Sequence, residues 1–225
     1  RQVTHTEGGR AMKLPRIPIV KDVIPYLVVC VALAAAVYVI MPLASIIPLT
    51  LLILIASFFR DPERKSPHLP STLISPADGR IIEIDEVFEE RFLHDVSQKV
   101  SIFMSLLDVH MVRSPVYGKV GYLSYKKGRF LPAFHKRASY ENERKFVGIY
   151  NSHTKILMTE VAGMIARRIV CYLKEGDTLV QSQRVGLIKF GSRVDIYVPM
   201  SVEITVRKGQ RVKGGGTIIG RLKTE

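Results

Sequence analysis

The sequence predicts a mainly β protein that carries a hydrophobic helical hairpin at its N-terminal end. Two observations predict this fold class. A long uncharged apolar block lies near the start of the chain, and after residue 75 short runs rich in Ile, Val, Tyr and Phe alternate with Gly, Pro and Asp. No long amphipathic helix is evident after the apolar block. The 225 residues therefore suit an anchor plus one domain that is large enough to form a core.

We expect four segments, which are a polar and basic tail at 1–22, a membrane-anchoring helical segment at 23–59, a linker at 60–75 and a β-rich domain at 76–225. No charged residue occurs from Val23 to Phe59, and this block exceeds the roughly 20 residues that one membrane span needs. Pro42 and Pro48 interrupt it, which favours two helices at about 24–41 and 44–59. Whether the second helix spans a membrane stays open, and a cleavable signal peptide is the weaker alternative.

The net charge of +13 indicates an anionic partner, either a nucleic acid or a lipid surface. The apolar block favours lipid, and the dispersed basic residues lack the aromatic-and-basic pattern of RNA-binding sheets. Basic residues flank both ends of the block, so we expect both ends to face the cytoplasm at the cell membrane. Cys30 and Cys171 give no disulfide framework, and no cluster has metal-ligand spacing.

The β-rich part contains two internal echoes that predict hairpins of the barrel-sandwich kind. The stretch 75–81 (SPADGRI) is echoed by 114–120 (SPVYGKV), and 174–179 (KEGDTL) is echoed by 207–212 (RKGQRV). Such hairpins occur in domains that carry biotin or lipoate on a lysine, but Gly191 and Ser192 stand between the later copies instead. One alternative is therefore a non-enzymatic, membrane-tethered carrier or adaptor module in which these two residues form a turn. Strands are expected at 80–87, 99–104, 118–125, 147–151, 155–161, 165–173, 185–190, 194–199, 201–206 and 217–222.

Several stretches in order resemble the phosphatidylserine decarboxylase family in its short form. They cover nearly the whole chain after the hairpin, and their order and spacing make the resemblance specific. They are FFRDPER at 58–64, SPADGRI at 75–81, IFMSLLDVHMVRSPVYGKV at 102–120, NER at 142–144, GMIARRIV at 163–170 and GLIKFGSRVDIYVP at 186–199.

The resemblance implies that the chain cuts itself between Gly191 and Ser192. The serine hydroxyl attacks the glycine carbonyl, and the products are a chain of residues 1–191 and a chain of residues 192–225 that stay associated. Ser192 then becomes a pyruvoyl group, which condenses with the amine of a serine-headgroup phospholipid and accepts electrons as carbon dioxide leaves. The substrate is phosphatidylserine or its archaeal ether-lipid equivalent, archaetidylserine. Oligomeric state stays open, with a homo-oligomer as one possibility.

The resemblance also implies roles for His110 and Asp78. His110 is the candidate acid or base, since a neutral imidazole exchanges protons near pH 7. Asp78 would orient or charge that histidine, although an aspartate that merely forms a turn is the alternative, and Asp108 is a substitute candidate. By this resemblance, longer family members carry a His-x-x-His pattern here, and Arg113 takes the place of its second histidine. The group that activates Ser192 is therefore open, with His110 a candidate for both steps.

Four arginines near these motifs are candidates for binding the lipid phosphodiester through forked hydrogen bonds. The competing interpretation is that they are charged residues at solvated strand edges. They are Arg113, Arg167, Arg168 and Arg193.

Overall fold

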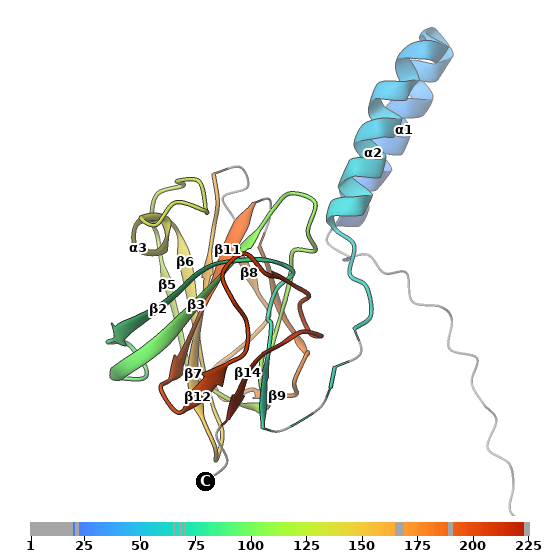
Figure 1. Cartoon of the computed structure of the whole chain (residues 1–225). Helices are drawn as coiled ribbons and strands as arrows, with labels where there is room; N and C mark the ends of the chain where they lie inside the picture. Colours follow the sequence, from blue (N-terminus) through green and yellow to red (C-terminus); the bar gives the residue numbers. More distant parts are fainter. Residues whose placement is uncertain are drawn as a thin grey trace, which may run out of the picture.

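The protein is described here by a computed structural model that covers residues 20, 23–64, 66–67, 69, 71–164, 169–188 and 191–222. A helical hairpin leads into a strongly curled β domain, and the hairpin projects from one end of that domain (Figure 1). The predicted fold class is confirmed.

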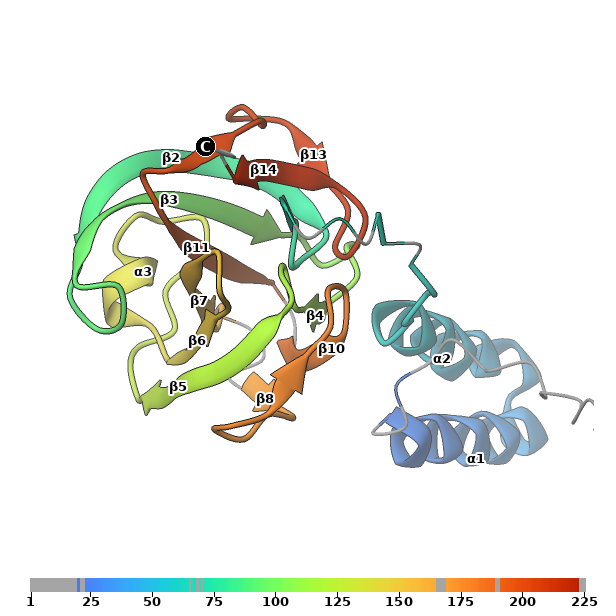
Figure 2. The same cartoon turned by 90° about the horizontal axis from the view of Figure 1, so that it is seen from below.

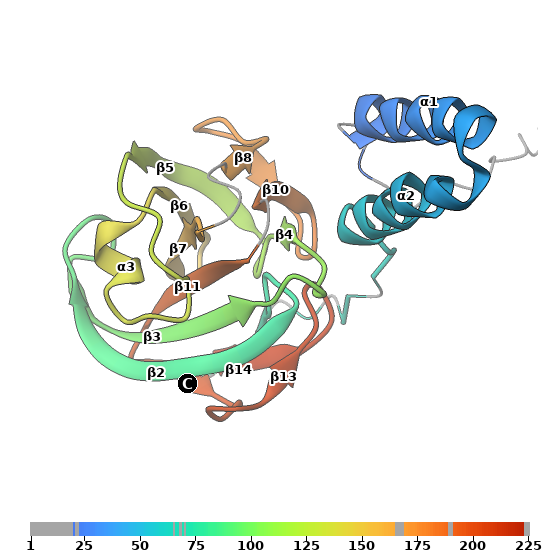
Figure 3. The ribbon, with the colours of Figure 1, turned by 90° about the horizontal axis from the view of Figure 1, so that it is seen from above.

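The hairpin consists of α1 (Ile24–Ile40), the 3-10 turn η2 (Pro42–Ser45) and α2 (Ile46–Phe58), close to the two helices expected from the sequence. Pro42 occupies the first position of η2, where its missing N–H leaves no hydrogen bond unmade. The two helices lie side by side (Figure 3), and most of their side chains are exposed; Val39, for example, is 83% exposed. Among the described residues, no helix is both long and apolar enough to cross a membrane.

The strands pair antiparallel in three sheets, of which the largest has eight strands in the order β13-β2-β3-β11-β7-β6-β5-β9. The two smaller sheets have the orders β1-β14-β12 and β4-β10-β8. The strands are β1 (Thr72–Ile74), β2 (Gly79–Glu89), β3 (Asp95–Met104), β4 (Met111–Arg113), β5 (Gly118–Lys126), β6 (Arg144–Tyr150), β7 (Lys155–Val161), β8 (Ile169–Cys171), β9 (Thr178–Leu179), β10 (Arg184–Ile188), β11 (Ser192–Pro199), β12 (Val202–Ile204), β13 (Arg211–Val212) and β14 (Ile218–Leu222).

Every strand expected from the sequence has a counterpart, although β8 is described only at Ile169–Cys171. The sequence missed β1, β4, β9 and β13, and it also missed the short helix α3 (Ala138–Glu141). Each missed strand has two or three residues, too few to show an alternation of apolar and polar side chains. One of them, β1, lies within the stretch that reads as a linker.

The large sheet curls around the main core, and β2 and β3 wrap one side of the domain (Figure 2). Along β11, Val194 and Ile196 point into that core, whereas Arg193 and Asp195 alternate with them and so face the other side of the sheet. Ser192 shares the core-facing side with Val194 because side chains two residues apart in a strand point the same way. The curl therefore turns Ser192 into the interior.

The echo between 75–81 and 114–120 corresponds to two turns of the same construction. The Ser75 hydroxyl donates to the carbonyl of Ala77 at 2.7 Å, and the Ser114 hydroxyl donates to the carbonyl of Val116 at 2.8 Å. In each turn the serine side chain closes a loop of the backbone on itself, as small hydroxyl residues do in turns. Each turn then feeds a long strand, β2 in the first case and β5 in the second.

These two turns also bind each other reciprocally. The N–H of Ile74, which precedes the first turn, donates to the carbonyl of Pro115 at 3.1 Å, and the N–H of Arg113 donates to the carbonyl of Pro76 at 2.8 Å. The turns of the second echo each bind one of the strands that follow the first two turns, since Gly176 N–H donates to the carbonyl of Val120 in β5 and Gly209 N–H donates to that of Ile81 in β2. The internal repeat is therefore a structural one, with its two halves joined at the turns.

Replacing Gly79 with alanine tests how tightly the first turn packs. Its φ is +155°, and an added Cβ would lie 2.1 Å from the carbonyl oxygen of Phe103. Because that oxygen belongs to the backbone of β3, we expect Gly79→Ala to lower the free energy of unfolding by about 2–4 kcal/mol, measured by urea unfolding. Gly176→Ala is the matched control, since its φ is +91° but no atom lies within 4 Å of the added carbon. Equal losses in both variants would contradict the packing argument.

Candidate active site

Gly191 and Ser192 lie where the chain passes from β10 into β11. Gly191 has a φ of +56°, a left-handed conformation that glycine adopts without a steric penalty. Ser192 is fully buried, and its hydroxyl donates to the thioether sulfur of Met104 at 3.3 Å. A thioether is a weak acceptor, so the serine oxygen is not held by a strong hydrogen bond.

His110 is in direct contact with this dipeptide. Its Nε2 accepts a hydrogen bond from Gly191 N–H at 3.2 Å, and its Nδ1 lies 2.9 Å from the carbonyl oxygen of Asp108. Since Nε2 accepts, Nδ1 carries the proton and donates it to that carbonyl. The ring of Phe58, from the end of α2, lies 4.1 Å from the imidazole between centroids. The buried His110 is therefore a neutral imidazole in a defined tautomer.

Burial also lowers the pKa of His110 to about 4, although the hydrogen bond to the Asp108 carbonyl opposes this shift. An imidazole with such a pKa is unprotonated at neutral pH. Its Nε2 is therefore a hydrogen-bond acceptor that holds no proton to give.

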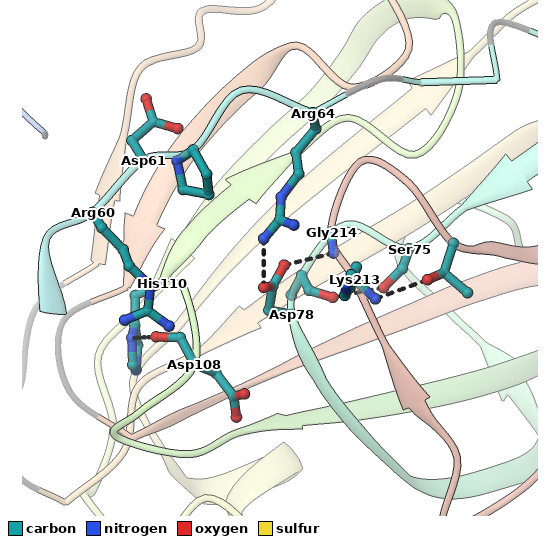
Figure 4. A network of polar contacts seen from close by, with 12 residues as sticks. Arg60, Asp61, Arg64, Ser75, Asp78, Asp108, His110, Lys213 and Gly214 are labelled. Atoms are coloured by element: carbon teal, nitrogen blue, oxygen red, sulfur yellow. Dashed lines mark hydrogen bonds and ion pairs between the residues drawn. The ribbon is translucent and has the colours of Figure 1, made fainter. Parts of the chain in front are cut away.

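Asp78 forms a second cluster beside His110 (Figure 4). One carboxylate oxygen pairs with Arg64 at 2.6 Å, and the other accepts the N–H of Gly214 at 2.7 Å. Burial raises the pKa of Asp78, and the charge of Arg64 acts in the opposite direction. The structure thus brings Asp78 to Arg64, whereas the His110 ring is hydrogen-bonded to the Asp108 carbonyl and the Gly191 N–H. The role expected for Asp78 in orienting the imidazole stays a prediction.

Arg113 is buried and tied to other parts of the protein. Its guanidinium donates to Asp61 at 2.8 Å, to the carbonyl of Pro62 at 3.0 Å and to the carbonyl of Ser182 at 3.1 Å. Asp61 also pairs with Arg184. These contacts indicate that Arg113 joins the stretch after α2 to the β domain. Its guanidinium N–H groups are used in these bonds rather than directed at a phosphodiester.

Arg193 is 1% exposed and lies on the side of β11 opposite Ser192. Its Nε donates to Asp195 at 2.5 Å, while Nη2 donates to Ser101 at 2.6 Å and also pairs with Glu83. The neighbouring carboxylates raise the pKa of this guanidinium against the effect of burial. Arg193 is thus part of a buried ion network. Arg167 and Arg168, the other two candidates, lie outside the described residues.

Two arginines that the sequence did not single out as site residues, Arg60 and Arg64, lie in the same region as His110 and Asp78 (Figure 4). Arg60 donates to the carbonyl of Leu107 at 2.5 Å and to that of Ser57 at 2.7 Å, and Arg64 pairs with Asp78. Both belong to the stretch 58–64. The signal that could have found them is the position of basic residues directly after an apolar helix, where a lipid headgroup would lie.

Within the described ranges no group of His, Cys, Asp and Glu is arranged to hold a metal ion.

Removing the Arg113 guanidinium should destabilise the fold. Arg113→Met leaves Asp61 buried with one partner fewer, and we expect the free energy of unfolding to fall by about 3–5 kcal/mol, measured by urea denaturation. Arg137→Met is the matched control because Arg137 pairs with Glu141 on the surface, and it should leave stability unchanged. A small effect of Arg113→Met would show that Arg113 does not hold these segments together.

Comparisons with known proteins show the family to which the chain belongs. Residues 51–220 match the family model described as phosphatidylserine decarboxylase. A phosphatidylserine decarboxylase proenzyme from Carboxydothermus hydrogenoformans is 48% identical over 174 residues, which cover 77% of this chain and 82% of the relative. Another proenzyme of the same name, from Desulfotalea psychrophila, is 40% identical over 217 residues, or 94% of this chain and all of the relative.

Proposed function

Because the chain belongs to the phosphatidylserine decarboxylase family, we propose that it decarboxylates a serine-headgroup phospholipid after cutting itself between Gly191 and Ser192. The observation that carries this is the 3.2 Å hydrogen bond between Gly191 N–H and His110 Nε2, which joins a neutral buried imidazole to the scission point. The matching relatives are named as proenzymes, in keeping with a chain that processes itself. The family favours this enzyme over a carrier or adaptor module.

Self-cleavage begins when the Ser192 oxygen attacks the carbonyl of Gly191. Glycine leaves that carbonyl open because it has no side chain, and its φ of +56° bends the backbone at this point. The Ser192 hydroxyl faces only the Met104 sulfur among its described hydrogen-bond partners, so conversion of Ser192 to a pyruvoyl group breaks no polar network. That group, once formed, supplies a carbonyl that takes up the substrate amine and accepts the electrons released with carbon dioxide.

His110 and Arg60 are the residues that we assign to the substrate. The neutral Nε2 of His110 accepts a hydrogen bond from the substrate nitrogen and so holds it in place, and the amine reacts in its unprotonated form because only a free amine is nucleophilic. Cleavage after Gly191 creates a new chain end there, which allows the Gly191 N–H to leave Nε2 and expose it. Arg60, next to His110 at the end of α2, binds the phosphodiester (Figure 4). Arg113 and Arg193 are engaged by carboxylates and serve the fold instead.

We assign the protein to the cytoplasmic face of the cell membrane, with the exposed apolar hairpin as its anchor. The turn after β3 supports this, since Leu106 and Leu107 are 46% and 79% exposed although both are apolar. Arg60 links that turn to α2 through the Leu107 carbonyl, and a Cβ added at Gly191 would lie 3.9 Å from a methyl carbon of Leu106. An apolar turn beside the scission point and continuous with the hairpin suits a lipid surface. Basic residues at both ends of the hairpin favour the cytoplasmic side.

The first test is the mass of the purified chain. We expect two fragments, residues 1–191 and 192–225, with the smaller one blocked at its N-terminus and carrying a keto group. Ser192→Ala removes the nucleophile and should give one intact chain without decarboxylase activity. Activity of the wild type on synthetic phosphatidylserine and archaetidylserine then identifies the lipid class. An active wild type that remains a single chain would overturn the self-cleavage.

A charge on the apolar turn tests the membrane surface. Leu107→Glu should lower decarboxylation of substrate in anionic vesicles by about 10-fold, because an acidic side chain cannot enter the lipid surface, while activity on a dispersed short-chain substrate stays unchanged. Phe88→Glu is the matched control, since Phe88 is 66% exposed but lies near the far end of β2 from the site. Equal losses on vesicles and on dispersed substrate would contradict membrane contact by this turn.

A further inference from the structure

Glu160 is a buried acid in β7. It is fully buried, and both of its carboxylate oxygens lack a partner among the described residues. Buried carboxyl groups are almost always paired or hydrogen-bonded, since an unsatisfied one costs free energy. An exception of this kind, close to a reactive residue, calls for a functional explanation.

The strand register brings Glu160 close to Ser192. Glu160 lies directly opposite Val194 in the pairing of β7 with β11, and Ser192 comes two residues before Val194 in β11. Residues two apart share a face, so Glu160 and Ser192 both point into the core. Such diagonal neighbours lie about 7–8 Å apart between their backbones, within reach of a long side chain. A glutamate with two free oxygens can therefore reach the serine hydroxyl.

The space around the carboxyl group is provided by β10. Gly186 faces Glu160 from the small sheet that lies across from β7 and β11 (Figure 3), and a Cβ added there would lie 3.0 Å from Oε1. A side chain at position 186 would thus press on the carboxyl group. Among the described residues, the ionisable groups that interact with it are Lys145, opposite Glu160 in β6, and Cys171 in β8.

The other candidates for activating Ser192 are engaged elsewhere. His110 Nε2 already accepts the Gly191 N–H, and Arg113 is bound to Asp61 and two carbonyls. The serine proton therefore needs another acceptor, and Glu160 is the buried carboxyl on the same face.

We propose that Glu160 is the catalytic base of self-cleavage, taking the proton from Ser192 Oγ and then passing it to the backbone nitrogen of Ser192. In this step the bond between Oγ and the Gly191 carbonyl carbon forms, and the bond from that carbon to the Ser192 nitrogen breaks. The proton that leaves the hydroxyl arrives at the released amine, so the step is an isomerisation that needs no further reactant. The inference rests on the self-cleavage proposed above and names the group that starts it.

The protonation behaviour of the two candidate bases differs. Burial raises the pKa of Glu160 to about 8, and the charge of Lys145 opposes this only in part. A base with a pKa near the working pH combines availability with proton affinity. His110, with a pKa of about 4, would be fully available throughout the neutral range.

The experiment follows disappearance of the full-length chain on a gel after a pulse of cell-free synthesis, at pH values from 6 to 9. With Glu160 as the base, the cleavage rate should rise about 50-fold from pH 6 to pH 8 as the carboxyl ionises. A rate that stays flat over this range would assign the base to His110 and overturn the proposal. Cys171→Ser should keep the rise, which separates it from titration of the neighbouring thiol.

Glu160→Gln keeps the shape of the protonated side chain but removes the base, and it should slow cleavage about 100-fold or more. Glu203→Gln, on an exposed residue of β12, should cleave at the wild-type rate. Cleavage of Glu160→Gln at the wild-type rate would overturn the proposal while leaving the self-cleavage of the wild type intact. A wild type that never cleaves would instead overturn the proposed function itself.

Stability is compared in chains that carry Ser192→Ala, so that cleavage does not interfere. Because the pKa of Glu160 is raised in the folded state, the folded chain loses stability as pH rises from the unfolded value of about 4.5 toward 8. Glutamine does not ionise, so adding Glu160→Gln should give a melting temperature at pH 8 at least as high as that of Ser192→Ala alone. A large fall in melting temperature would assign Glu160 a structural role and overturn the proposal.

Discussion

The hydrogen bond from Gly191 N–H to His110 Nε2 is the contact on which the site depends. It joins the start of β11 to the segment before β4, and the ring of Phe58 covers the imidazole from the helical hairpin. If Nε2 were protonated, its N–H would face the Gly191 N–H, and neither buried donor would have an acceptor. This contact therefore requires a neutral imidazole. One hydrogen bond therefore accounts for the tautomer and for the neutral state of His110.

The paired turns of the internal repeat explain why this contact is held firmly. Arg113 N–H binds the carbonyl of Pro76 only three residues after His110, so the strand that follows the imidazole is fixed to the turn that contains Asp78. Arg113 also holds the stretch after α2 through Asp61. The same short strand thus connects the two halves of the repeat and the hairpin. A site built on such a strand is kept in place by backbone bonds rather than by flexible side chains.

Charge and motif gave only part of the site. Ser192, Gly191 and His110 could be named as candidates from the sequence, because their stretches resemble a family in order and spacing, and the structure brings Gly191 and His110 into contact. Arg113 and Arg193 were candidates for binding a phosphodiester, yet both are buried and paired with carboxylates. Arg113 pairs with Asp61, which is far away in the sequence, and Arg193 pairs with Glu83, which lies on another strand of the sheet. The sequence around an arginine does not show whether its guanidinium is paired with a carboxylate or available to a ligand. Glu160, which we propose as the base, could not be singled out from the sequence, because a single acid in an apolar run resembles any strand residue.

The sequence by itself determined the elements that show a regular alternation of apolar and polar residues or an interruption by proline. The uncharged block with Pro42 defined the hairpin, and alternation of apolar and polar residues defined the long strands from β2 to β11. Only the tertiary structure decided the two- and three-residue strands, the pairing of Asp78 with Arg64, and the position of Glu160 on the same face as Ser192. These features depend on which distant segments meet when the sheet curls closed. Contacts of that kind leave no local pattern, since each partner is chosen by the register of a strand elsewhere in the chain.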